Sequence, residues 1–271
     1  MSLLHALVAA FFSGALYRDV AHRWRPGRGV ALLALALAVG WAVQVTSIGR
    51  SLGAWAHGDA AAFIAALPPL VLRDGQLEAS PPGPHALTLG SGDQADRVVI
   101  DTSQDPVAMT PETRIRVTRT ELAVRRNALE TRTFAMGSAV EMAGLEDGPV
   151  DPDVLQGVVD GFARWAPVVL YPVAVVVELL YRIAAAALLA LVALPLGRLL
   201  GTRLDYGRHF VVSLVALVPL VLVASLLSAY GAPLPAWAGV VLAVGYLAFA
   251  LRSAAERAPA ASGPAVVGGG A

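Results

Sequence analysis

The 271-residue sequence contains no cysteine and no lysine, and only 15% of its residues are charged. Without cysteine, the chain can form no disulfide, use no thiol nucleophile and bind no metal through thiolates. Soluble globular proteins carry about 25% charged residues, so this low charge and the mean hydropathy of +0.64 indicate a membrane-embedded protein. Twenty arginines balance twenty acidic residues, and this neutral, apolar composition argues against a disordered or nucleic-acid-binding chain.

Long runs without charged residues locate three membrane spans. The first run has 21 residues, and at 1.5 Å per residue it reaches about 31 Å, the thickness of a hydrocarbon core. A later run is too long for one crossing, and a turn containing Pro and Gly at residues 230–235 divides it. The sequence therefore predicts transmembrane helices over residues 30–49, 209–229 and 236–251.

Residues 165–200 form a longer apolar stretch that contains three prolines and the charged pair Glu178 and Arg182. One interpretation is a single helix that begins outside the membrane and tilts through it. The other is an interfacial piece up to about Tyr181, followed by a span over residues 183–200. We prefer the single helix, and both interpretations give four crossings.

The placement of the arginines predicts the orientation of these crossings. The N-terminal segment, the loop around residues 201–208 and the tail of residues 252–271 together carry nine arginines against three acidic residues. Residues 50–164 carry ten arginines against sixteen acidic residues. We therefore expect a multi-pass protein of the bacterial inner membrane, with both termini in the cytoplasm and residues 50–164 outside. The tail, rich in Ala, Gly and Pro, is expected to be disordered.

Residues 1–29 are predicted to form a cytoplasmic amphipathic helix followed by a basic segment. Apolar residues recur at helical spacing over the first sixteen positions. The arginines follow this run instead of preceding it, which argues against a signal peptide. A helix lying on the membrane surface fits the pattern, and the alternative is an apolar start packed on the bundle.

Residues 50–164 are predicted to form an inserted, small, antiparallel β-rich domain. A short helix is expected at residues 58–66, and Asp74-Gly75 is a strong hairpin signal. Asp151-Pro152 marks the start of a helix that continues into the span over residues 165–200. The core is thin, so packing against the flanking helices or a partner is expected. The predicted strands cover residues 70–72, 76–78, 86–89, 97–101, 114–118, 121–125 and 129–136.

Several short segments carry a resemblance to a known family. The chain resembles the uncharacterised bacterial membrane family called domain of unknown function 1189, some of whose members are described as maltodextrin-utilisation proteins from operon context. This resemblance implies an integral inner-membrane protein with an extracytoplasmic insert, and it brings no established catalytic residues. The matching segments are Leu16-Tyr-Arg-Asp19, residues 68–77, residues 98–102, residues 120–126 and residues 130–134, together with the three C-terminal spans.

Glu178 and Arg182 are the leading candidates for a functional site. Their spacing of four residues places them on one face of a helix, where they can pair. Ionisable residues inside a membrane are costly and are often functional. Two other interpretations remain open: the pair is structural and bonds to other spans, or Arg182 lies at the outer interface and extends its charged end into water.

Other polar residues in the spans provide weaker candidates. Gln44, Ser213 and Ser225 are predicted to lie among the transmembrane helices, where such groups usually hydrogen-bond between helices. The five histidines are scattered, and no paired metal-ligand spacing occurs in the sequence. We therefore expect no metal, no cofactor and no catalytic residues. The polar cluster at Asp101 is interpreted as a turn cap.

The sequence therefore predicts a membrane α-helical bundle with four transmembrane helices, an N-terminal amphipathic helix and an inserted extracytoplasmic β-rich domain. Its predicted role is non-enzymatic: an accessory, assembly or envelope-regulatory protein whose outer domain meets a protein partner or a second copy. No nucleic-acid partner is expected. The alternative is a small transporter or lipid-handling protein that uses Glu178 and Arg182, although the inverted repeats common in transporters are not seen. A membrane enzyme comes third, since no catalytic motif supports it.

Overall fold

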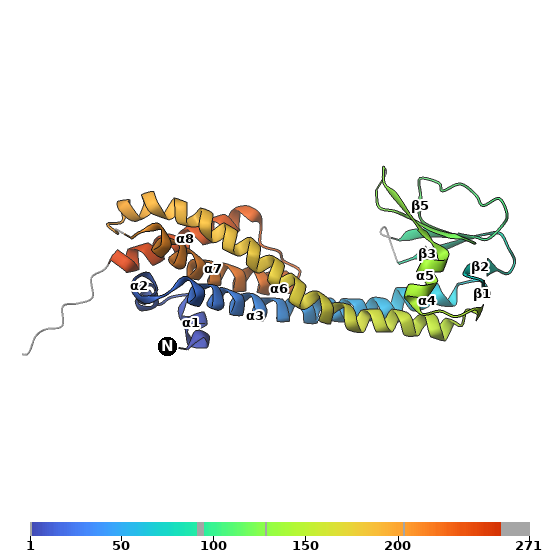
Figure 1. Cartoon of the computed structure of the whole chain (residues 1–271), viewed down its shortest axis with the longest axis horizontal. Coiled ribbons are helices and arrows are strands. Elements are labelled where there is room, and N and C mark those ends of the chain that lie inside the picture. The colour runs from blue at the N-terminus through green and yellow to red at the C-terminus, as the bar shows by residue number, and fades with distance from the viewer. Residues whose placement is uncertain (1, 91–94, 128, 203, 256–271) are drawn as a thin grey trace, which may run out of the picture. The chain divides into compact units, whose positions relative to one another are not determined.

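The computed structural model divides into two compact units. One unit comprises Met1–Ser47 with Val168–Ala271, and the other comprises Ile48–Pro167. The first is helical, and the second contains all the β-strands (Figure 1). The boundary falls within two long helices, α3 (Pro26–Trp55) and α6 (Pro152–Leu199). The structure describes residues 2–90, 95–127, 129–202 and 204–255.

Four helical segments in the described part of the chain are long and apolar enough to cross a membrane. They are Pro26–Ala65, which begins with α3, then α6, α7 (Tyr206–Ala229) and α8 (Ala236–Ala255). Helix α6 has 48 residues, and at 1.5 Å per residue it is about 72 Å long. It begins at the proline that the sequence marked as a helix start and runs without a break, which confirms the single-helix interpretation of residues 165–200.

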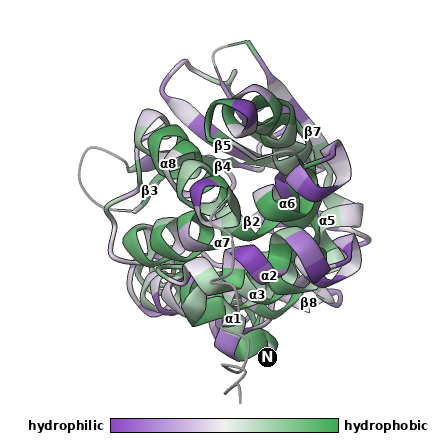
Figure 2. Ribbon diagram, turned by 90° about the vertical axis from the view of Figure 1, so that its left-hand side faces the viewer, coloured by the Kyte–Doolittle hydropathy of each residue, from purple (hydrophilic) through white to green (hydrophobic). Residues whose placement is uncertain are grey.

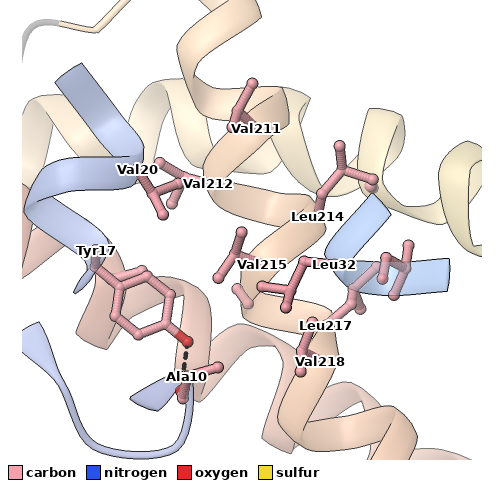
Figure 3. Close-up of a cluster of buried hydrophobic side chains, with 14 of the residues drawn as sticks. Ala10, Tyr17, Val20, Leu32, Val211, Val212, Leu214, Val215, Leu217 and Val218 are labelled. Carbon is pink, nitrogen blue, oxygen red and sulfur yellow. Dashed lines mark hydrogen bonds between the residues drawn. The ribbon is translucent and has the colours of Figure 1, made fainter. Parts of the chain in front are cut away.

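Helix α7 is the centre of the bundle. Every residue from Val211 to Val221 is buried, as expected of a helix that is apolar on all sides. Figure 2 shows mostly hydrophobic colouring on α7 and α8 and hydrophilic stretches on α2, and Figure 3 shows apolar side chains of the bundle meeting around Val215 and Leu217. Helix α6, in contrast, exposes most of its apolar side chains, the surface that lipid would cover.

The N-terminal region forms two short helices, α1 (Leu3–Ala9) and α2 (Gly14–Arg23), where one amphipathic helix was expected. The Ser13 hydroxyl accepts the Leu16 N–H and caps a new helix. Helix α2 packs on α7 and α8. Its Tyr17 is fully buried and donates to the Ala10 carbonyl at 2.7 Å (Figure 3), and burial raises the pKa of this phenol far above its usual value. This arrangement matches the alternative of an apolar start packed on the bundle.

The C-terminal bounds differ slightly from those expected. Helix α8 continues to Ala255, beyond the predicted end at residue 251. Residues 252–255 are thus helical, whereas the rest of the tail that the sequence predicts to be disordered, residues 256–271, lies outside the described residues. Helix α7 begins at Tyr206, three residues before the predicted start, because the Asp205 side chain accepts the Arg208 N–H and caps it.

The second unit contains two sheets. A three-stranded sheet has the order β2-β1-β8, and a five-stranded sheet has the order β3-β4-β5-β6-β7. A core of Leu70, Leu72, Leu77, Ala79, Ile100 and Met136 brings together residues from both sheets. The bounds are β1 Leu70–Arg73, β2 Gln76–Ala79, β3 Pro84–Leu89, β4 Asp96–Asp101, β5 Thr113–Thr118, β6 Glu121–Arg125, β7 Thr131–Ala135 and β8 Gly148–Pro149.

All seven strands predicted from the sequence are present, but the larger sheet is mixed instead of wholly antiparallel. Strands β4 and β5 pair in parallel. The eleven residues between them are too many for a tight hairpin and enough for a crossover. The expected turn at Asp74-Gly75 is confirmed, because both residues have positive φ, 51° and 70°, as a two-residue hairpin requires. The expected helix near residues 58–66 is found as a π-helical turn (Ala56–Ala60) followed by α4 (Ala61–Ala65).

One helix and one strand were not expected from the sequence. Helix α5 (Met136–Ala143) follows β7 directly and ends at Gly144, whose φ of 65° is left-handed. Strand β8 is only two residues long and pairs with β1. Helix α5 helps to cover the small core, since its Met136 is buried in it.

Candidate functional site

Glu178 and Arg182 form an ion pair on α6, as their spacing predicts. The Arg182 Nη2 and Nε groups donate to Glu178 Oε1 at 2.8 and 3.1 Å. The indole Nε1–H of Trp41, on α3, donates to Glu178 Oε2 at 2.7 Å. Both carboxylate oxygens are therefore occupied. The two charged side chains are largely covered, with 19% of Arg182 and 25% of Glu178 exposed.

A second polar contact joins the same two helices. The Tyr171 hydroxyl of α6 donates to the Ala38 carbonyl of α3 at 3.1 Å. Tyr171 lies seven residues before Glu178 on α6, so this contact is distinct from the one that Trp41 makes. The guanidinium of Arg182 also lies over the Tyr181 ring, with 5.6 Å between its Cζ and the ring centroid. The arrangement can hold α3 against α6.

Trp41 was not identified from the sequence as part of this site. A signal was available, because an indole N–H in an apolar helix requires an acceptor, and the only acidic residue in residues 165–200 is Glu178. What the sequence could not supply is the rotation of α3 relative to α6, which decides whether the indole faces that carboxylate.

The other polar candidates do not join this pair. Gln44 is half-buried on α3, and its side chain makes no hydrogen bond with another described residue. Ser213 is fully buried on α7, and its Oγ has no partner among the described residues. Ser225, also on α7, lies so close to Gly40 of α3 that a Cβ on that glycine would overlap its Oγ. Ser225 therefore marks a close approach of two helices, as small residues do in membrane bundles.

In the β-containing unit, the polar residues around Asp101 act as a turn cap, as expected. Asp101 is fully buried, and its carboxylate accepts the Ser103 hydroxyl at 2.7 Å and the N–H groups of Val107 and Ser103 at 2.7 and 3.1 Å. Burial raises the pKa of this carboxyl, but these hydrogen bonds and the charge of Arg116 lower it by more, so its pKa lies below the usual value. The ionised cap holds the start of the crossover between β4 and β5.

Strand β7 is an exposed edge of the larger sheet. All five of its residues are exposed, including the apolar Phe134 at 42%. The opposite edge, β3, is half-covered at every second residue and contacts α4. An edge strand presents unpaired backbone groups on its outer side and is a template for another strand. Strand β7 is therefore the candidate binding surface of this unit.

In the described part of the chain, no group of three or more histidine, aspartate and glutamate residues could hold a metal ion. A family model described as "Protein of unknown function (DUF1189)" matches residues 4–251. No curated protein and no solved structure shows a significant match to the chain. The match covers both the helical bundle and the β-containing unit, so both lie within the region that the family model describes.

Proposed function

The chain belongs to the family of proteins of unknown function DUF1189, and we propose that it is a non-enzymatic accessory protein of the bacterial inner membrane. In this proposal the helical bundle anchors the chain, both termini are cytoplasmic, and the β-containing unit lies outside. That unit binds an extended segment of a protein partner and so serves an assembly or regulatory role in the envelope. The observation that carries the proposal is the exposed edge strand β7.

Strand addition is the binding mode that this edge supports. A partner strand would form main-chain hydrogen bonds along the five residues of β7, each contributing about 0.5–1.5 kcal/mol. The exposed ring of Phe134 offers an apolar contact beside them. A protein partner is favoured over a small soluble ligand because the unpaired N–H and C=O groups along an edge strand match those of another extended peptide backbone.

The contacts of Glu178 count against a transport path as the main function. A substrate or proton path through this pair needs carboxylate oxygens that are free to exchange partners. Here Oε1 is held by Arg182 and Oε2 by Trp41. This supports a structural role for the pair, in which its charges neutralise each other and join two helices.

Site-specific photo-crosslinking in native membranes tests the proposed binding edge. A photoreactive residue at Phe134 should capture a partner that the same residue at exposed Val107, elsewhere in the unit, does not. Thr133→Lys should reduce capture, since lysine on an edge opposes strand pairing. Thr88→Lys is the matched control, because Thr88 is an exposed threonine on the opposite edge strand. Capture of a second copy would identify a homo-oligomer, and capture of nothing at Phe134 would refute the proposal.

The absence of cysteine makes the orientation directly measurable. In intact cells, Leu129→Cys should react with a membrane-impermeant maleimide, because this side chain is 99% exposed in the unit placed outside. Arg252→Cys, at the end of α8, should react only after permeabilisation. Equal labelling of the two variants in intact cells would contradict the orientation.

A further inference from the structure

A cavity of about 680 Å³ lies at the turn that joins α6 to α7. Its lining includes the polar residues Arg198, Thr202, Asp205 and His209 and the apolar residues Leu194 and Leu204. The turn is the junction of two helices that can each cross a membrane. Such a junction lies at the level of the lipid headgroups.

Two buried polar side chains in this cavity have unused hydrogen-bonding atoms. His209 is 1% exposed and Thr202 is 5% exposed. Neither His209 Nδ1 nor Thr202 Oγ1 has a hydrogen-bond partner among the described residues. Leaving such a group buried and unpaired costs about 1–3 kcal/mol. Two of them in one cavity indicate a polar ligand.

The local backbone brings these two side chains together. Gly201 has a left-handed φ of 79° and ends α6, and the Thr202 N–H returns to the Gly197 carbonyl at 2.8 Å. A Cβ on Gly197 would lie 2.6 Å from Thr202 Oγ1 and 2.8 Å from His209 Cε1. Glycine at this position is therefore what allows the hydroxyl and the imidazole ring to approach the same point.

The charges around the cavity have both signs. Arg198 is exposed in the last turn of α6 and makes no ion pair with a described residue. The Asp205 carboxylate accepts the Arg208 N–H through Oδ1 and lines the same cavity as His209. The cavity thus offers a cation, a hydroxyl donor and a carboxylate.

We infer that this cavity binds the headgroup of a phospholipid that carries a primary ammonium, such as phosphoethanolamine. The phosphate lies against Arg198 and the Thr202 hydroxyl, as charge-assisted hydrogen bonds require. The ammonium lies against Asp205 and His209 Nδ1. Leu194 and Leu204 cover the glycerol end of the lipid, which a free phosphate would leave without a partner.

Native mass spectrometry of the full chain in detergent tests this inference. The protein is offered phosphatidylethanolamine, phosphatidylcholine, phosphatidylglycerol or inorganic phosphate. We expect one phosphatidylethanolamine to be retained per chain in preference to the other two lipids. Arg198→Gln should weaken retention of every phospholipid by at least about tenfold, the effect of losing one charge-assisted hydrogen bond.

Two further variants separate the parts of the site. Asp205→Asn retains the helix cap, since asparagine caps as well as aspartate, and it should abolish the preference for the ammonium headgroup while phosphatidylglycerol still binds. Arg252→Gln removes an exposed arginine from the last turn of α8, outside the cavity, and should change nothing. Equal retention of all three lipids, unaffected by Arg198→Gln, would overturn the inference. So would displacement of the lipid by inorganic phosphate alone, which would indicate a free-anion site.

Discussion

Replacing Glu178 by leucine should destabilise the bundle, because it leaves two donors without their acceptor. The Arg182 guanidinium loses both hydrogen bonds, and the Trp41 indole N–H loses its only partner in this contact. Removing one member of a fully buried ion pair costs about 3–5 kcal/mol. Since 19% of Arg182 and 25% of Glu178 are exposed, we expect a loss of about 2–3 kcal/mol in the free energy of unfolding.

The double variant Glu178→Leu with Arg182→Met tests whether the loss of stability in the single variant comes from leaving the Arg182 charge unpaired. With both charges removed, no unpaired ion remains, so the double variant should be more stable than the single one. The Trp41 N–H still lacks its acceptor, which leaves a deficit of about 1–2 kcal/mol against the parent. Trp41→Phe alone should cost about 1–2 kcal/mol, between the values for interhelical hydrogen bonds in lipid and for bonds to charged groups.

Reversible unfolding in mixed micelles measures these differences. The purified chain is titrated with sodium dodecyl sulfate, and the loss of helix is followed by far-ultraviolet circular dichroism. Two results would refute the reasoning. The single leucine variant could unfold at the same detergent fraction as the parent, or the double variant could prove no more stable than the single one.

Three further predictions concern other contacts. Tyr17→Phe should lower the free energy of unfolding by about 1 kcal/mol through loss of the buried bond to Ala10, which thermal unfolding in detergent measures. Gly40→Ala should cost about 1–3 kcal/mol by overpacking against Ser225, and adding Ser225→Gly should restore most of it in the same assay. Asp101→Asn should destabilise the chain at pH 7. Since the folded pKa of Asp101 is lowered, the parent's advantage should begin to shrink as pH falls below about 4 and be lost as pH falls through the folded pKa, so hydrogen exchange should show a smaller difference at pH 3 than at pH 7.

The strands and spans were predictable because their signals are local. Alternating apolar residues and turn residues such as Asp74-Gly75 located the seven strands, and the capping signal at Pro152 located the start of α6. The pairing of β4 with β5 was not predictable in the same way. A sequence shows where a strand lies but not which distant strand it joins, and only the eleven-residue connection hinted at a crossover.

The candidate site was predictable in part for the same reason. The i to i+4 spacing of Glu178 and Arg182 is a property of one helix, so their pairing follows from sequence. Trp41 lies 137 residues away from Glu178, and its contact depends on how two helices rotate against each other. The two-helix N-terminal region was missed because the hydrophobic periodicity of the first sixteen residues continues through the Ser13 cap.

The packing of α2 on α8 has a consequence for how the protein is made. Tyr17 meets Phe249 edge to face, with 5.6 Å between ring centroids, so a side chain near the start of the chain completes its surroundings only with one near the end. At a synthesis rate of 5–20 residues per second, the ribosome needs roughly 10–50 seconds to reach the second ring after the first. Throughout that interval α2 lacks α8, the helix on which it packs in the complete chain. A chain cut short before α8 therefore leaves the α2 surface that packs on α8 uncovered.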